Sequence, residues 1–233
     1  MTTHLVKRNK ITKRQMKEDP LVTFAGRTMD QWDRHSNQIL VIGGVLVLLV
    51  LLAVFMVQAR GKAETKASGE LYRASLVVNQ GDYTSATSML QEIIDNEPGT
   101  NAAREAMLYM GDCYMGQKKA ADAMTWYQKF VDKAGGDRER QRIGYYALGT
   151  ALEDTKDLKK AADAYAESAK RCNTANERGR AMLAQARCLL GSGQPAQAVD
   201  VYKTVATMPG AEASVTEAAT VRLAEIQATP QTP

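Results

Sequence analysis

The feature that most constrains the fold is a motif that recurs four times between residues 81 and 205. Each copy has an alanine and, four positions later, a bulky residue. The alanines are Ala86, Ala123, Ala161 and Ala198, at spacings of 37, 38 and 37 residues, and the bulky residues are Leu90, Tyr127, Tyr165 and Tyr202. Because positions i and i+4 share one face of an α-helix, the motif predicts four equivalent helices with the same buried face.

A second helical stretch precedes each copy of the motif. Its small residues are Ala74, Gly111, Gly149 and Ala186, and the larger residues three positions on are Val77, Tyr114, Leu152 and Leu189. Small residues allow close approach of two helices, and the larger ones fill the space between them. The sequence therefore predicts an all-α domain of four antiparallel helix pairs, in which the repeated tyrosines belong to the core.

The pattern resembles the tetratricopeptide repeat (TPR), most closely at Gly81, Tyr83, Ala86 and Pro98, and the resemblance covers residues 64–209. It implies an α-solenoid of four TPR-like helix pairs over residues 67–210. A stretch with Val215, Ala219 and Leu223 on one face predicts a C-terminal capping helix at 211–227, since a terminal repeat exposes its apolar side. We expect residues 228–233 to be a disordered tail.

Ile39 to Val57 form an uninterrupted run without a charged or hydrogen-bonding side chain. As a helix it would span about 28 Å, which matches the hydrocarbon core of a bilayer. A cleaved signal peptide is the competing interpretation, because Val57 and Ala59 fit small residues before a cleavage site. The run is too long and begins too far into the chain for that. We expect a transmembrane helix at residues 38–59, followed by a linker at 60–66.

The net charge of +4 is concentrated before this run, where residues 1–37 carry eight basic and four acidic side chains. We expect this basic tail to lie in the cytoplasm, although Arg60, Lys62, Lys66 and Arg73 follow the run and weigh against that orientation. Within the tail, Asp19-Pro20 is typical of a helix start. The apolar residues that follow it predict either an amphipathic helix in the membrane interface or a short linker helix.

Composition excludes several classes of function. From Gly61 onward, 21 basic and 22 acidic residues offer no broad positive surface, so we expect no nucleic-acid partner. Both histidines, His4 and His35, precede the hydrophobic run, and Cys113, Cys172 and Cys188 form no C-x-x-C pair. These patterns predict a protein that is not an enzyme, with no metal, no cofactor and no small-molecule substrate.

The TPR resemblance implies that protein partners bind along the first helix of each pair. The corresponding residues are Leu71, Ser75, Val78, Leu108, Asp112, Met115, Tyr146, Thr150, Glu153, Leu183, Arg187 and Leu190. We expect this groove to be mostly apolar and suited to extended or unfolded chains. Alternatively, the capping helix or a neighbouring protomer covers several of these residues. Cytosolic TPR co-chaperones hold a carboxylate with a clamp of lysine and asparagine residues. Here leucine or tyrosine stands at the lysine positions, and the asparagine positions are occupied by Ser75, Asp112, Thr150 and Arg187.

The order of basic tail, single anchor and TPR domain resembles the YfgM-type ancillary subunits of the bacterial Sec translocon. This resemblance implies a bacterial inner-membrane protein with its N-terminus in the cytoplasm and its TPR domain in the periplasm. Its partners would be the translocon, chaperones or unfolded secretory clients. Two alternatives stay open: a structural assembly factor of an envelope complex with one fixed partner, and a cytoplasm-facing regulatory scaffold. The sequence leaves the oligomeric state open.

Overall fold

The computed structural model describes the backbone of residues 20–228 and the side chains of residue 38 and residues 40–228. The chain divides into two compact units, with the boundary between Ala59 and Arg60. Helix α1 (Pro20–Asn79) contributes to both. The N-terminal part of the basic tail, the side chains of the expected amphipathic stripe and residues 229–233 lie outside the described residues, so the predictions for them stay untested.

The first unit contains the apolar run. Every described side chain from Leu40 to Val57 is exposed, including large ones such as Phe55, at 69%. Within the described part of the chain, one helix is long and apolar enough to cross a membrane, judged by length and composition. Large apolar side chains exposed on all sides of a helix indicate a segment that contacts an apolar environment other than its own chain. The run is thus a candidate membrane span.

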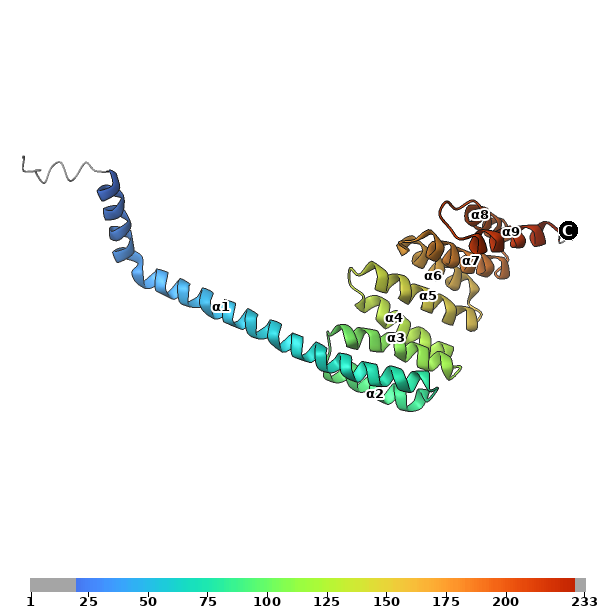
Figure 1. Ribbon diagram of the computed structural model, residues 1–233, viewed down its shortest axis with the longest axis horizontal. Helices are drawn as coiled ribbons and strands as arrows, with labels where there is room; N and C mark the ends of the chain where they lie inside the picture. The colour runs from blue at the N-terminus through green and yellow to red at the C-terminus, as the bar shows by residue number, and fades with distance from the viewer. Residues whose placement is uncertain (1–19, 229–233) are drawn as a thin grey trace, which may run out of the picture. The chain divides into compact units, whose positions relative to one another are not determined.

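The second unit is a stack of helices in chain order (Figure 1). After α1 come α2 (Tyr83–Asn96), α3 (Asn101–Gly116), α4 (Ala120–Lys133), α5 (Arg138–Asp154), α6 (Leu158–Arg171), α7 (Ala175–Gly191), α8 (Pro195–Ala206) and α9 (Ala213–Ala228). From α2 to α9, each helix packs mainly on its neighbours in sequence. The C-terminal part of α1 pairs with α2, α3 with α4, α5 with α6 and α7 with α8. The predicted all-α architecture of TPR-like helix pairs is confirmed.

Side chains at the helix N-termini explain where several of these helices begin. The side chains of Asp82, Thr100, Asp137, Asp157 and Thr174 each accept a hydrogen bond from a backbone N–H in the first turn of α2, α3, α5, α6 and α7. Such caps satisfy N–H groups that have no partner inside the helix. At α7, Thr174 and Glu177 form a complete capping box.

Close packing within the pairs depends on the repeated small residues. A Cβ atom placed at Gly149 would lie 2.9 Å from Cδ1 of Tyr165, and one at Gly111 would lie 2.8 Å from Cζ of Tyr127. Tyr127 and Tyr165 are 3% and 1% exposed, so neither ring can move away without disturbing the core. Glycine is therefore required at Gly111 and Gly149, whereas the fourth pair has Ala186 in the same register as Tyr202. The repeated tyrosines lie in the core, as the sequence predicts.

The turns inside the pairs share one backbone conformation. The equivalent residues Gly81, Lys118, Lys156 and Gly193 have φ angles of +81°, +59°, +67° and +78°. Glycine adopts this left-handed conformation without a steric penalty, whereas a lysine does so at a cost of roughly 1 kcal/mol. The second and third pairs therefore keep the turn geometry of the first and fourth pairs without a glycine.

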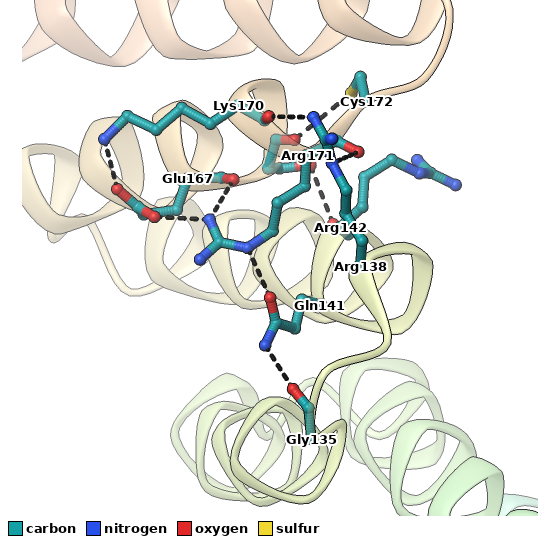
Figure 2. A network of polar contacts seen from close by, with 9 residues as sticks. Gly135, Arg138, Gln141, Arg142, Glu167, Lys170, Arg171 and Cys172 are labelled. Atoms are coloured by element: carbon teal, nitrogen blue, oxygen red, sulfur yellow. Dashed lines mark hydrogen bonds and ion pairs between the residues drawn. The ribbon is translucent and has the colours of Figure 1, made fainter.

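A polar network ties the third pair to the turn before it (Figure 2). Arg138, at the start of α5, donates to the carbonyl oxygens of Lys170 and Arg171 at the end of α6, at 2.8 and 3.1 Å. Arg171 in turn donates to Gln141, which donates to the carbonyl oxygen of Gly135. These contacts satisfy terminal carbonyl groups of α6 and place positive charge at the negative end of that helix.

Residues 60–66, expected as a linker, are helical because they lie within α1. Glu64 contacts the next pair directly, and Lys66 contacts the end of α2 in its own pair. The Glu64 carboxylate accepts the backbone N–H groups of Asn101 and Ala102 at 2.7 and 3.1 Å, and Lys66 forms a 2.8 Å ion pair with Glu97. A carboxylate at a helix N-terminus is favoured by the helix dipole. Judged by these contacts, the packed repeat unit begins at Glu64 or earlier.

Candidate functional site

The twelve residues predicted to bind partners lie on α1, α3, α5 and α7, three to each helix. They differ in exposure. Leu71 is buried; Ser75, Val78, Leu108, Met115, Glu153 and Leu183 are half-buried; Asp112, Tyr146, Thr150, Arg187 and Leu190 are exposed. We refer to this surface, formed by the first helices of the pairs, as the helix A groove. Most of its side chains can contact a bound polypeptide.

Tyrosines of the second helices reach the centre of the helix A groove from below. The Tyr127 hydroxyl donates to Asp112 Oδ1 at 2.7 Å. The Tyr165 hydroxyl donates to Glu153 Oε2 at 3.0 Å and lies 3.1 Å from Thr150 Oγ1. Asp112 and Thr150 each directly follow a glycine that a tyrosine ring covers, so the ring emerges beside them. These hydrogen bonds fix the orientation of polar groups in the groove.

Burial dominates the acid–base properties of this layer. Desolvation raises the pKa of the Tyr127 and Tyr165 hydroxyls, and the neighbouring carboxylates raise it further, so both tyrosines remain hydrogen-bond donors. Desolvation also raises the pKa of Asp112, while the hydrogen bond from Tyr127 acts in the opposite direction. Asp112 is thus exposed at the groove surface, while its carboxylate, held by the Tyr127 hydroxyl, is partly desolvated.

An ion pair joins the third and fourth pairs across the groove. Arg187 Nε donates to Glu153 Oε1 at 2.7 Å, and a terminal nitrogen of Arg187 donates to Glu153 Oε2 at 2.8 Å. This bidentate geometry is the strongest that arginine and a carboxylate form. The hydrogen bond from Arg187 is the main reason that the pKa of Glu153 lies below its ordinary value. The groove predicted as mostly apolar therefore has a polar strip along its centre, formed by Asp112, Thr150, Glu153 and Arg187.

A cavity of about 530 Å³ opens on the groove side of the first two pairs. It overlaps the predicted residues at Leu71 and Ser75 only. Its other lining residues are Glu64, Ser68, Tyr72, Asn101, Ala102, Glu105, Tyr109 and Arg140. Tyr72 and Tyr109 occupy equivalent positions in α1 and α3, as do Ser68 and Glu105. Sequence reasoning missed all four, although the repeat register shows that Tyr72 and Tyr109 lie one position after Leu71 and Leu108, and that Ser68 and Glu105 lie three positions before them.

The chemistry available in the groove is that of binding. Within the described residues, no group of three or more histidine, cysteine, aspartate or glutamate side chains could hold a metal ion. Cys113, Cys172 and Cys188 are free and buried. Burial raises the pKa of Cys113 and Cys188 to about 11, so both thiols are protonated and poorly nucleophilic at neutral pH.

Comparison with known proteins supports a TPR protein. The profile of the tetratricopeptide repeat family matches residues 71–138. A crystal structure of nearly identical TPR-like repeats from Podosopora anserina, assigned to a kinesin light chain, is similar to 70% of this chain. The match covers 86% of that protein at 13% identity, with a TM-score of 0.57. A variant of the same repeats matches at 14% identity over 70% and 85% of the two chains, also with a TM-score of 0.57.

A crystal structure of MamA matches at 20% identity over 66% of this chain and 92% of that protein, with a TM-score of 0.49. No curated protein sequence shows a significant match. At these identities the structural likeness shows the fold alone. The TPR fold is in general a protein-interaction scaffold that performs no catalysis, and the helix A groove is where the described residues offer a surface for that role.

Proposed function

We propose that this chain is a single-pass membrane protein whose TPR domain binds polypeptide segments in the helix A groove, as a periplasm-facing accessory of protein translocation or chaperoning in the bacterial inner membrane. The observation that carries the binding function is the groove itself, in which apolar side chains flank oriented polar groups. Tyr146 and Leu190 are 39% and 38% exposed there. Large apolar side chains on a fixed helical surface favour contact with extended apolar segments.

The position of the capping helix supports an accessible groove. Helix α9 packs against α8 and, less extensively, against α7. Val215 and Ala219 of α9 are buried in the core of the later repeats. The main contacts of α9 are therefore within the fourth pair, away from the groove residues of α1, α3 and α5. This arrangement leaves a neighbouring protomer as the remaining alternative cover for those residues.

Placement in the periplasm rests on the basic tail and on the apolar run of exposed side chains. Free thiols are commoner in reducing compartments, which favours the cytoplasm-facing alternative. However, Cys113, Cys172 and Cys188 are at most 2% exposed, and this burial shields them from oxidants. Their presence is compatible with export.

Orientation can be tested with one added cysteine. Ala224 is exposed on α9, whereas the native thiols are buried, so a membrane-impermeant maleimide should label Ala224→Cys selectively. We expect labelling in intact bacterial spheroplasts, with little increase after detergent is added. Labelling that requires detergent would place the domain in the cytoplasm and support the regulatory scaffold. The parent chain, treated identically, measures labelling of the native cysteines.

Partner binding can be tested by photo-crosslinking in living cells. A photoreactive amino acid at Leu108, Met115 or Leu183 would lie in the groove, and one at Asp163, exposed on α6, provides a control on a second helix. We expect the groove positions to capture several secretory proteins and the control position to capture few. Capture of one protein in stoichiometric amount would support the assembly factor. An equal capture pattern at all four positions would contradict binding in the groove.

A further inference from the structure

Helix α3 presents three polar or aromatic side chains toward the groove at helical spacing. Glu105, Tyr109 and Asp112 are separated by four and three residues and therefore lie along one face. Glu105 and Tyr109 line the 530 Å³ cavity together with Tyr72 of α1. The three side chains form an acidic and aromatic line beginning at the cavity and ending at the polar strip.

The other charged groups of the cavity are already engaged. The Glu64 carboxylate accepts two backbone N–H groups at the start of α3. Arg140 forms an ion pair with Asp137 at 2.7 Å and donates to Asn101 at 3.0 Å. Among the contacts of the described residues, Glu105 makes no ion pair and no hydrogen bond. The cavity therefore contains one carboxylate without a partner among these contacts, whereas its cation, Arg140, is paired with Asp137.

The aromatic walls favour the same kind of ligand. Tyr72 is 66% exposed and Tyr109 is half-buried. The faces of tyrosine rings attract cations, and the planar guanidinium group of arginine stacks on them better than an ammonium group does. A cavity of this volume has room for one long side chain together with its neighbouring backbone. An acidic ligand would instead meet Glu105 in the cavity and Asp112 beyond it.

We infer that the cavity binds an arginine side chain of the bound polypeptide, with Glu105 as its counter-ion and Tyr72 and Tyr109 against its guanidinium plane. Asp112 extends the negative charge toward a second basic residue about two helical turns along α3. The inference rests on the proposed function, since it assigns a residue preference to the same groove. It predicts a preference for a cationic side chain, whereas a carboxylate clamp prefers an anionic group.

The test uses the full chain in nanodiscs of zwitterionic lipid, so that basic peptides do not bind the membrane. The probes are fluorescein-labelled peptides of alternating leucine and serine, identical except for one central arginine, citrulline or glutamate. Citrulline has the shape of arginine without its charge. From an ion pair with the exposed Glu105 carboxylate and weak cation–π contacts with the two tyrosine rings, we expect about five-fold tighter binding of the arginine peptide than of the citrulline peptide.

Glu105→Gln should reduce that preference to about two-fold, the share left to the tyrosine rings. The control is Glu92→Gln, which removes the same charge from an exposed position of α2 and should leave the five-fold preference unchanged. Unaltered binding of the citrulline peptide by Glu105→Gln would show that the variant folds and keeps its groove.

Equal binding of the arginine and citrulline peptides by the parent chain would overturn the inference while leaving the groove as a binding site. Tighter binding of the glutamate peptide would overturn it as well, as would a preference that Glu105→Gln leaves intact. If no peptide binds, binding of extended polypeptides in the groove is contradicted too, and the arginine inference is overturned with it.

Discussion

Gly111→Ala should destabilise the repeat unit, although alanine is the better helix former. Gly111 lies in the middle of α3, under the buried ring of Tyr127. A new Cβ atom would lie 2.5 Å from Cδ1 and 2.8 Å from Cζ of that ring, far inside van der Waals contact. The ring can yield only by moving its hydroxyl away from Asp112, to which it donates at 2.7 Å.

The expected loss in the free energy of unfolding follows from three contributions. Overpacking a well-packed core costs about 2 kcal/mol. Loss of a hydrogen bond to a charged group costs about 1.5 kcal/mol. The gain in helix propensity from glycine to alanine offsets about 1 kcal/mol of this. The net loss of about 2 to 2.5 kcal/mol corresponds to a decrease in Tm of roughly 4–10 °C for a domain of this size.

The chain itself contains the compensated arrangement, because the first pair has Ala74 and Leu90 at the positions of Gly111 and Tyr127. Tyr127→Leu alone should cost about 2 kcal/mol through lost volume and the lost hydrogen bond. The double variant Gly111→Ala/Tyr127→Leu should cost about 1 kcal/mol, because the clash is relieved and the gain in helix propensity remains. The coupling free energy of the cycle would then be about 3 kcal/mol.

The assay is denaturant unfolding of the full chain in detergent, followed by circular dichroism, with hydrogen exchange of the α3 and α4 amides to locate the change. Gly69→Ala is the matched control: it makes the same replacement in α1, where a Cβ would have nothing within 4 Å. That variant should be as stable as the parent or more stable. Additive losses in the double variant, or a Gly111→Ala protein as stable as the parent, would refute the packing explanation.

Three further predictions concern the turns, the cross-groove ion pair and the thiols. Lys118→Gly should raise the free energy of unfolding by about 0.5 kcal/mol because it relieves a left-handed lysine, whereas Lys129→Gly inside α4 should lower it by about 1 kcal/mol. The pKa of Glu153 is lower in the folded protein than its ordinary value of 4.5. The ion pair therefore stabilises the fold fully above pH 4.5, and this stabilisation is lost as the pH falls through the pKa of the folded state. Glu153→Gln should accordingly flatten the decrease in Tm between about pH 5 and pH 3. The Cys113 and Cys188 thiols, with a pKa of about 11, should react with an aromatic disulfide reagent at pH 8 only when the protein is unfolded; rapid labelling of the native chain would contradict their burial.

The helix pairs could be predicted because their cause is repeated along the sequence. Ala86, Ala123, Ala161 and Ala198 recur at nearly constant spacing, and each is completely buried in the structure. A single alanine four residues before a tyrosine would be ambiguous, whereas four copies at one spacing permit only a repeat architecture. Placement of the groove residues on the first helices follows from the same register.

The chemistry inside the groove could not be predicted in the same way. Whether Asp112 meets a hydroxyl depends on how closely α3 and α4 approach at Gly111, and whether Arg187 reaches Glu153 depends on the rotation between consecutive pairs. Both are properties of packing between elements, which periodicity within one helix does not encode. The cavity beside Glu105 and Tyr109 depends likewise on the distance between α1 and α3.

Core packing and recognition are coupled in this domain because the same tyrosines serve both. In the second and third pairs, a ring that fills the core also holds a polar group of the groove by its hydroxyl. In the first pair Leu90 has no hydroxyl, and Ser75 donates instead to the carbonyl oxygen of Tyr72 in its own helix. Oriented polar groups reduce the entropy lost on binding. The centre of the groove, at Asp112 and Thr150, should therefore discriminate between ligands more strongly than its first pair, and core substitutions beneath it should change specificity before they unfold the domain.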